Sequence, residues 1–246
     1  MTIALEAINL NKNFGGIQVT QNINLQIQAG ERRLIIGPNG AGKTTLFNQI
    51  TGEIRPSSGS IKIYGQDVTN LPANHRPHMG LSRTFQIINL FNQDNALHNI
   101  ALALLGVDQR RFNPFKKLKA SDIVYEKAEA VLKTIGLEGS AHKKVGEMSY
   151  GEQRRIEIGL AMSQNPKLLL LDEPLAGLSH NERIWIKDLI TSIPKSTTIV
   201  MIEHDMDVAL AFAEKISLLH YGRLIVEGDR DTVVNHPQTK EIYLGK

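Results

Sequence analysis

The eight residues Gly37-Pro38-Asn39-Gly40-Ala41-Gly42-Lys43-Thr44 decide the fold of this chain. Their order matches G-x-x-x-x-G-K-[ST], a loop whose glycines let successive backbone N–H groups face one phosphate. The apolar run Leu34–Ile36 precedes the loop and predicts a strand, and the residues up to Ile50 predict a helix that stops at Gly52. This order is the context that the motif requires, and it disfavours the alternative of an incidental glycine-rich turn.

Each part of the loop has a chemical task at a phosphate group. Lys43 places a positive charge between the β- and γ-phosphates, Thr44 offers a hydroxyl ligand to magnesium, and the helix N-terminus adds its dipole. We therefore expect ATP and Mg²⁺ as cofactors. The predicted binding residues are Gly37, Pro38, Asn39, Gly40, Ala41, Gly42, Lys43, Thr44 and Thr45, with Thr44 also a metal ligand.

The composition narrows the classes of function. The chain has 246 residues, 41% hydrophobic and 22% charged, which is typical of a globular protein with one substantial core. No apolar run reaches the ~18 residues that span a bilayer, and the N-terminus lacks the pattern of a signal peptide. The absence of cysteine excludes disulfides and thiolate metal sites. A net charge of +3 is too small to indicate nucleic acid. We expect a cytoplasmic protein.

The predicted type of secondary structure changes twice along the chain. Short β-rich runs at Ile3–Leu10, Ile23–Ile27 and Ile61–Tyr64 are separated by glycine-rich turns, which predicts an antiparallel sheet. Helical periodicity then extends from about Leu97 to Leu160. Afterwards, two buried-type strands alternate with helix-like sequence and predict a parallel sheet. A closing hairpin follows; these last strands are expected at Lys167–Leu171, Thr197–Ile202, Lys215–Leu219 and Arg223–Val226.

Two acidic residues follow the first of these buried strands. Asp172 and Glu173 stand at its carboxyl end, and ligands of open α/β sheets bind at that edge. Asp172 is therefore expected to hold magnesium, and Glu173 to polarise the water that attacks the γ-phosphate. An isolated Asp-Glu pair would more simply cap a helix. The phosphate loop favours the catalytic interpretation.

The stretch Ser149-Tyr150-Gly151-Glu152 reads locally as a capping box, in which Ser149 and Glu152 bond each other's backbone N–H groups. Gly151 in the first helical turn costs stability but exposes N–H groups to an anion. At this point the sequence resembles the ATP-binding-cassette ATPases, whose signature Leu-Ser-Gly-Gly-Gln also precedes the acidic strand. The resemblance covers nearly the whole chain. It implies that Ser149, Gly151 and Glu152 contact ATP.

The same resemblance assigns roles to further residues. It implies that Phe14 stacks on adenine, that Gln86 reaches magnesium and water, and that His204 contacts the γ-phosphate and orients Glu173. Glu173, His204 and Gln86 are thus the expected catalytic residues, and Thr44, Gln86 and Asp172 the expected metal ligands. Ser179 replaces an aspartate of the family, and Tyr150 replaces a glycine of its signature. These two departures concern signalling across the interface between subunits rather than ATP binding.

The family resemblance implies one ABC ATPase domain with an α/β P-loop NTPase fold, an antiparallel β subdomain and an inserted helical subdomain. We expect the catalytic core at residues 1–86 and 161–246 and the helical subdomain at 87–160. In this family, the loop of one protomer and the signature of another close on the same ATP. The implied partner is therefore a second ABC ATPase subunit, identical or related, in a head-to-tail dimer.

The family also implies membrane partners. Integral membrane permease subunits are expected to dock near Ile87–Phe91, on the inner face of the membrane, and a solute-binding protein acts with them indirectly. The segments Leu81–Gln86, Ser149–Ile158 and Glu241–Gly245 look like those of branched-chain amino acid importers and their urea and amide relatives. A lipopolysaccharide-export ATPase is the alternative. A soluble, non-transport ABC ATPase is the alternative from another class.

Overall fold

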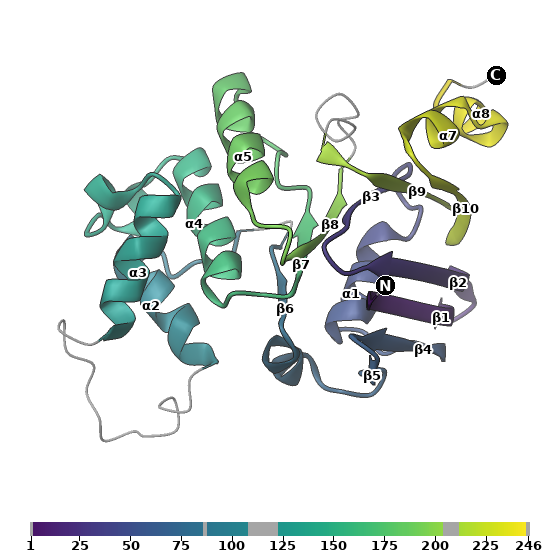
Figure 1. Ribbon diagram of the computed structural model, residues 1–246, viewed down its shortest axis with the longest axis horizontal. Helices are drawn as coiled ribbons and strands as arrows, with labels where there is room; N and C mark the ends of the chain where they lie inside the picture. The colour runs from purple at the N-terminus through teal and green to yellow at the C-terminus, as the bar shows by residue number, and fades with distance from the viewer. Residues whose placement is uncertain (1, 86–87, 108–122, 204–211, 245–246) are drawn as a thin grey trace. The chain divides into compact units, whose positions relative to one another are not determined.

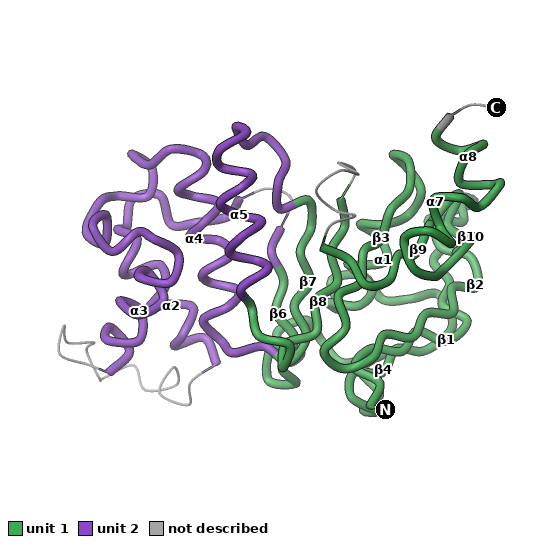
Figure 2. The backbone as a smooth tube through the Cα atoms, turned by 45° about the horizontal axis from the view of Figure 1, so that its top comes forward, with its two compact units in different colours: residues 1–83, 167–173, 193–246 green, residues 84–166, 174–192 purple. Residues whose placement is uncertain are grey.

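The computed structural model describes residues 2–85, 88–107, 123–203 and 212–244 (Figure 1). Its contacts divide the chain into two compact units (Figure 2). The first comprises residues 1–83, 167–173 and 193–246, and the second comprises residues 84–166 and 174–192. The helical segment expected at 87–160 lies within the second unit. The second unit also contains residues 174–192, which follow the acidic strand and include a helix.

The first unit begins with a four-stranded antiparallel sheet in the order β2-β1-β4-β5. Its strands have the bounds β1 Ile3–Phe14, β2 Ile17–Gln28, β4 Ser58–Ile63 and β5 Gln66–Asp67. β1 and β2 form a longer hairpin than the β-rich runs predict, because pairing continues to a tight turn at Gly15. Asn9 and Asn22 adopt positive φ, and the register of the pair shifts along its length.

A six-stranded sheet with the order β10-β9-β3-β8-β7-β6 forms the rest of this unit's framework. All neighbouring pairs are parallel except β9 and β10, which form the expected closing hairpin. The bounds are β3 Arg32–Ile36, β6 Leu81–Arg83, β7 Leu168–Asp172, β8 Thr198–Ile202, β9 Lys215–His220 and β10 Arg223–Gly228. Every residue of β3, β7 and β8 is buried, as continuous apolar runs predict.

Helix α1 (Lys43–Thr51) joins the two sheets through one hydrophobic core. Leu46, Phe47 and Ile50 of α1 are fully buried within it. They pack in the cluster that also contains Leu10 and Ile61 from the antiparallel sheet, and residues of β3, β7 and β8. The phosphate loop therefore emerges from a rigid base. Helices α7 (Arg230–Asn235) and α8 (Pro237–Leu244) follow β10 in this unit.

A fully buried arginine fixes the C-terminal end of α1. Arg76 lies in the 3-10 segment Ala73–Met79 and is 1% exposed. Its guanidinium donates to the carbonyls of Gln49 at 2.9 Å and Val68 at 2.6 Å, and also to those of Ile50 and Leu71. Gly52 gives it room, because a Cβ there would lie 2.5 Å from Nε. Burial lowers the pKa of Arg76 to about 10, so it remains charged at neutral pH.

The second unit is helical. It contains α2 (Ala96–Gly106), α3 (Ile123–Thr134), α4 (Tyr150–Ser163) and α5 (His180–Ser192), with short 3-10 turns at Glu138–Ser140 and Val145–Glu147. α3 and α4 approach closely at Gly159, where a Cβ would lie 3.2 Å from Val131 of α3 and 3.0 Å from Ile135, just after the helix. Arg155 of α4 stacks 4.1 Å from the ring centroid of Trp185 on α5. No helix in the described part of the chain is long and apolar enough to cross a membrane.

Candidate nucleotide site

The phosphate loop connects β3 to α1 and is shaped by glycines that no other residue could replace without strain. Gly37 has φ 153°, and a Cβ there would lie 2.2 Å from the carbonyl oxygen of Leu219 in β9. Gly42, at φ 100°, approaches the Val19 carbonyl of β2 in the same way. Because the neighbouring backbone presses on both glycines, the loop is held in a tight curve at the carboxyl edge of β3.

Lys43 closes the loop with its side chain. Its Nζ donates to the carbonyl oxygens of Gly37 at 2.7 Å and Pro38 at 3.1 Å, so the ammonium group lies over the turn of the chain. Burial lowers the pKa of Lys43, while the negative charges of Glu173 and Asp172 raise it. The lysine of the loop and the two acidic residues at the end of β7 therefore share one electrostatic site in the first unit.

The N-terminus of α1 offers a place for an anion. Its N-cap, Gly42, has no side chain to bond the first N–H groups, and the first turn contains no acidic residue. Thr44, in that turn, is exposed. Backbone donors, the positive end of the helix dipole and the Lys43 ammonium thus converge at one point. This arrangement suits the phosphates of a nucleotide.

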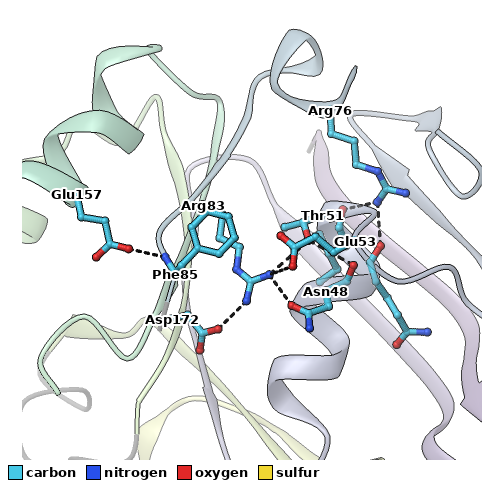
Figure 3. Close-up of polar contacts among 10 residues, drawn as sticks. Asn48, Thr51, Glu53, Arg76, Arg83, Phe85, Glu157 and Asp172 are labelled. Carbon is cyan, nitrogen blue, oxygen red and sulfur yellow. Dashed lines mark hydrogen bonds and ion pairs between the residues drawn. The ribbon is translucent and has the colours of Figure 1, made fainter. Parts of the chain in front are cut away.

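Asp172 is the last residue of β7, and Arg83 holds its carboxylate. Arg83 Nη2 donates to Oδ2 of Asp172 at 2.8 Å, and Asp172 is 1% exposed (Figure 3). Burial raises the pKa of Asp172, whereas the hydrogen bond and charge of Arg83 lower it. The arginine fixes the orientation of a carboxylate that would otherwise be costly to bury.

The same guanidinium also contacts the C-terminal half of α1 and Glu53, just beyond the helix. Its Nη1 donates to Oδ1 of Asn48 at 2.6 Å and to the carboxylate of Glu53 at 3.2 Å (Figure 3). Arg83 therefore connects the helix behind the phosphate loop to the acidic end of β7. We did not predict this role from the sequence. The available signal was a charged residue in the short strand Leu81–Arg83, next to an otherwise apolar sheet.

Glu173 follows Asp172 in an unusual backbone conformation. Its φ is 47°, in the left-handed region, and its N–H donates to the carbonyl of Ile202 in β8 at 3.0 Å. A non-glycine residue with positive φ carries strain that the surrounding structure must support. The neighbouring strand supplies that support and turns the chain sharply where β7 ends. Such strained positions cluster at sites of chemistry.

The donors near the loop fit Mg²⁺ better than a metal held wholly by protein. Thr44 supplies a hydroxyl and Asp172 a carboxylate, both hard oxygen ligands. Within the described residues, no group of three or more His, Cys, Asp or Glu side chains could hold a metal. Mg²⁺ commonly takes one or two protein ligands and completes its shell with phosphate oxygens and water. The set therefore suits a metal that arrives with a nucleotide.

The capping box predicted in the second unit is confirmed. Ser149 N donates to Glu152 Oε2 at 2.8 Å, and Glu152 N donates to Ser149 Oγ at 3.2 Å. Gly151 lies between them in the first turn of α4. A Cβ on Gly151 would lie 1.9 Å from the Glu182 carboxylate of α5, so a larger residue there would displace the Glu182 side chain. The proposed nucleotide-contacting residues of this unit thus form one rigid helix start.

The remaining predicted site residues are placed only in part. Phe14 ends β1 with its ring 45% exposed and Lys12 Nζ 5.0 Å from the ring centroid, so a flat apolar surface faces outward. Gln86 and His204 lie outside the described residues. Their expected roles remain predictions.

Comparison with known proteins agrees with this geometry. The model of the ABC transporter family matches residues 20–176. The high-affinity branched-chain amino acid transport ATP-binding protein LivG of Escherichia coli strain K12 is 34% identical over 256 residues, covering 100% of both chains. A solved ATP-binding cassette of an ABC transporter in its ADP conformation is similar at a TM-score of 0.86 and 30% identity, covering 100% of each chain.

A second solved structure, a dimeric ATP-binding cassette in a post-hydrolysis state with ADP and Pi, aligns at a TM-score of 0.79 and 28% identity. It covers 92% of this chain and 98% of that one. The predicted α/β P-loop fold and the family resemblance are confirmed. With its match to the family model and its full-length relatives, the chain belongs to the ABC transporter family as an ATPase domain of the ATP-binding-cassette type.

Proposed function

We propose that this chain binds Mg-ATP at the loop Gly37–Thr44 and hydrolyses it to power an importer. The observation that carries the proposal is the convergence of Lys43, Asp172 and Glu173, whose charges act on one another at the carboxyl edge of the sheet. A buried ammonium, a glycine-shaped anion cradle and two carboxylates match the needs of phosphoryl transfer to water.

The chemistry follows from the position of each group. Lys43 and the backbone N–H groups of the loop bind the phosphates and withdraw their negative charge. Bound Mg²⁺, held by Thr44 and Asp172, would supply further charge neutralisation. Glu173 accepts a proton from a water molecule as its oxygen attacks the γ-phosphorus. The bond from that phosphorus to the bridging oxygen then breaks, releasing ADP and inorganic phosphate.

The site requires a second cassette. In the proposed head-to-tail dimer, Ser149, Gly151 and Glu152 of one subunit meet the γ-phosphate bound by the loop of the other. The rigid capping box of α4 supports this role, because its first-turn N–H groups are already oriented. Loss of the γ-phosphate contact after hydrolysis would let the subunits separate. The similar cassette solved with ADP and Pi is a dimer, which supports a dimeric functional unit.

Nucleotide titration of the purified chain tests the proposal directly. We expect the wild-type chain to bind ATP in the presence of Mg²⁺, and Lys43→Ala to weaken binding at least about tenfold, because a buried charge that faces the phosphates is lost. Lys240→Ala, an exposed change on α8, serves as the control. If the wild-type chain binds no ATP, alone or with its partner proteins, the proposal is wrong.

A permease docking surface is proposed in the second unit at Phe85 and Phe91. Both rings are exposed, Phe91 at 61%. The buried Asn99 holds the backbone of Phe91 from both sides, accepting from its N–H at 2.9 Å and donating to its carbonyl at 3.1 Å. With the Phe91 backbone fixed in this way, its exposed ring is an apolar surface that a partner could cover on binding. Ile87, part of the expected patch, lies outside the described residues.

Phe91→Ala tests the docking surface. We expect the variant to bind ATP like the wild type, but to lose stimulation of its ATPase activity by permease subunits about tenfold, because one apolar anchor is worth ~1–3 kcal/mol. ATPase assays with reconstituted permeases measure this. Tyr221→Ala, which removes another highly exposed ring, is the control. Equal stimulation of Phe91→Ala and wild type would contradict the surface.

The class of transported solute is proposed from the names of the similar proteins. The LivG protein of E. coli is named for high-affinity branched-chain amino acid transport, and this agrees with an importer of branched-chain or related hydrophobic amino acids. Urea and amides are the wider class. The same relatives favour an importer over a lipopolysaccharide exporter. The chain would then act on the cytoplasmic face of the membrane, bound to permeases that receive solute from a binding protein.

A further inference from the structure

Tyr150 occupies the position where the family signature has glycine, and its side chain connects three segments of the second unit. Its hydroxyl accepts a hydrogen bond from Arg154 Nη2 at 3.0 Å, one turn further along α4. Its ring packs on Gly177, where a Cβ would lie 3.1 Å from Cε1 of the tyrosine. Although 45% of Tyr150 is exposed, its hydroxyl and its ring therefore each have a contact within the unit.

Arg154 and Glu157 hold the backbone of Phe85 from both sides. Arg154 Nη1 donates to the Phe85 carbonyl at 3.0 Å. Glu157 Oε1 accepts from the Phe85 N–H at 2.7 Å, as Figure 3 shows. The two side chains also pair with each other at 2.6 Å, and both are buried. This clamp from the signature helix fixes the residue that immediately precedes Gln86.

The segment Ala176–Ser179 is held to the same helix start by a second contact. The Glu182 carboxylate lies against Gly151 and accepts from Ser179 N at 2.9 Å and from Ser179 Oγ at 2.6 Å. The hydrogen bonds from Ser179 lower the pKa of Glu182. Serine at position 179 thus acts within its own unit, as part of the start of α5. Tyr150 thus contacts this segment at Gly177, and Glu182 contacts it at Ser179.

We propose that Tyr150 is a positioning residue that orients Arg154 and thereby fixes Phe85, the residue before Gln86 in the sequence, while its ring packs on Gly177. The expected effect of Tyr150 on ATP turnover rests on the proposed function, whereas its contacts with Arg154 and Gly177 do not. A glycine at this position could do neither task. In this chain, the start of the signature helix therefore holds both Phe85 and the Ala176–Ser179 segment.

Tyr150→Phe separates the two tasks, because it keeps the ring on Gly177 and removes only the hydroxyl. Amide hydrogen exchange of the peptide containing Phe85 is the direct readout. We expect exchange of the Phe85 N–H to accelerate about fivefold to tenfold, since a hydrogen bond to a buried charged group is lost. Tyr221→Phe, at a ring 75% exposed, is the matched control and should change nothing. Unchanged exchange in Tyr150→Phe would overturn the proposal.

A double-mutant cycle with Arg154→Lys establishes the route. Lysine keeps the charge beside Glu157 but cannot bond Tyr150 and Phe85 together. We expect the double variant to exchange no faster than the faster single variant, whereas additive effects would show that the hydroxyl acts independently of Arg154. In parallel, kcat should fall several-fold in Tyr150→Phe with KM for ATP unchanged. If the wild type binds no ATP, the proposed function fails while the exchange result still decides the inference.

Discussion

Glu173→Gln is expected to abolish ATP turnover while leaving ATP binding intact. Glutamine has the same shape as glutamate, but its amide cannot accept the proton of the attacking water. General-base catalysis contributes about 10²- to 10⁴-fold, so kcat should fall by at least about a hundredfold. The backbone that places residue 173, with its positive φ and its bond to Ile202, is unaffected by the change. Single-turnover hydrolysis and equilibrium ATP binding, measured on the same preparation, test both parts.

Glu138→Gln provides the matched control for this experiment. Glu138 lies in an exposed 3-10 turn of the second unit, so the same chemical change there should leave kcat within a factor of about two. The proposed dimer gives a further expectation: Glu173→Gln with ATP should accumulate as a dimer that sizing experiments detect. Hydrolysis at the normal rate by Glu173→Gln would show that another group is the base.

Arg76→Met is expected to lower the free energy of unfolding more than any other substitution considered above. The methionine side chain fills part of the volume, but the carbonyls of Gln49, Val68 and Leu71 lose their charged donor in the interior of the first unit. The Gln49 and Val68 carbonyls keep their backbone donors from Gly52 and Leu71, so what is lost is the charge-assisted bonds. A hydrogen bond to a charged group contributes about 1.5–3 kcal/mol, so we expect the free energy of unfolding to fall by about 4 kcal/mol. The negative end of the α1 dipole also loses its neutralising charge.

Urea unfolding monitored by circular dichroism measures this loss. The midpoint of Arg76→Met should shift to lower urea, and the melting temperature should fall by roughly 10 °C for a chain of this size. Arg55→Met, at an exposed arginine in the same unit, should change stability by less than about 0.5 kcal/mol. Coincident midpoints for Arg76→Met and the wild type would mean that the buried guanidinium does not stabilise the end of α1.

Much of the fold could be predicted from local patterns. The phosphate loop follows from one motif, the buried strands β7 and β8 from continuous apolar runs, and the start of α4 from Ser149 and Glu152. These signals are short-range, because a strand's burial or a helix cap depends on residues within one or two turns. The residues at which helices and strands begin and end are predicted less accurately than their presence. The β1–β2 hairpin extends to Phe14, since pairing across a tight turn continues beyond the apolar run.

The contacts that organise the site could not be predicted in this way. Arg83 and Asp172 are separated by 89 positions, and Arg154 and Phe85 by 69. No periodicity indicates which buried carboxylate or carbonyl a charged side chain will reach. Arg83 and Arg154 both stand within motifs that were recognised, yet each acts through a partner that only folding brings near. Each binding residue of the proposed site thus belongs to a short motif, whereas the groups that orient these residues lie far away in the sequence.

The sequence by itself determined the family of this protein and its expected nucleotide chemistry, because a phosphate cradle is built from consecutive backbone N–H groups and needs only the right residues in the right order. The tertiary structure decided which charges are buried together and what holds them: Arg83 on Asp172, Arg76 on the end of α1, and Tyr150 with Arg154 on Phe85. The physical reason is that a buried charge is tolerable only where folded neighbours supply its partners, and those neighbours come from anywhere in the chain.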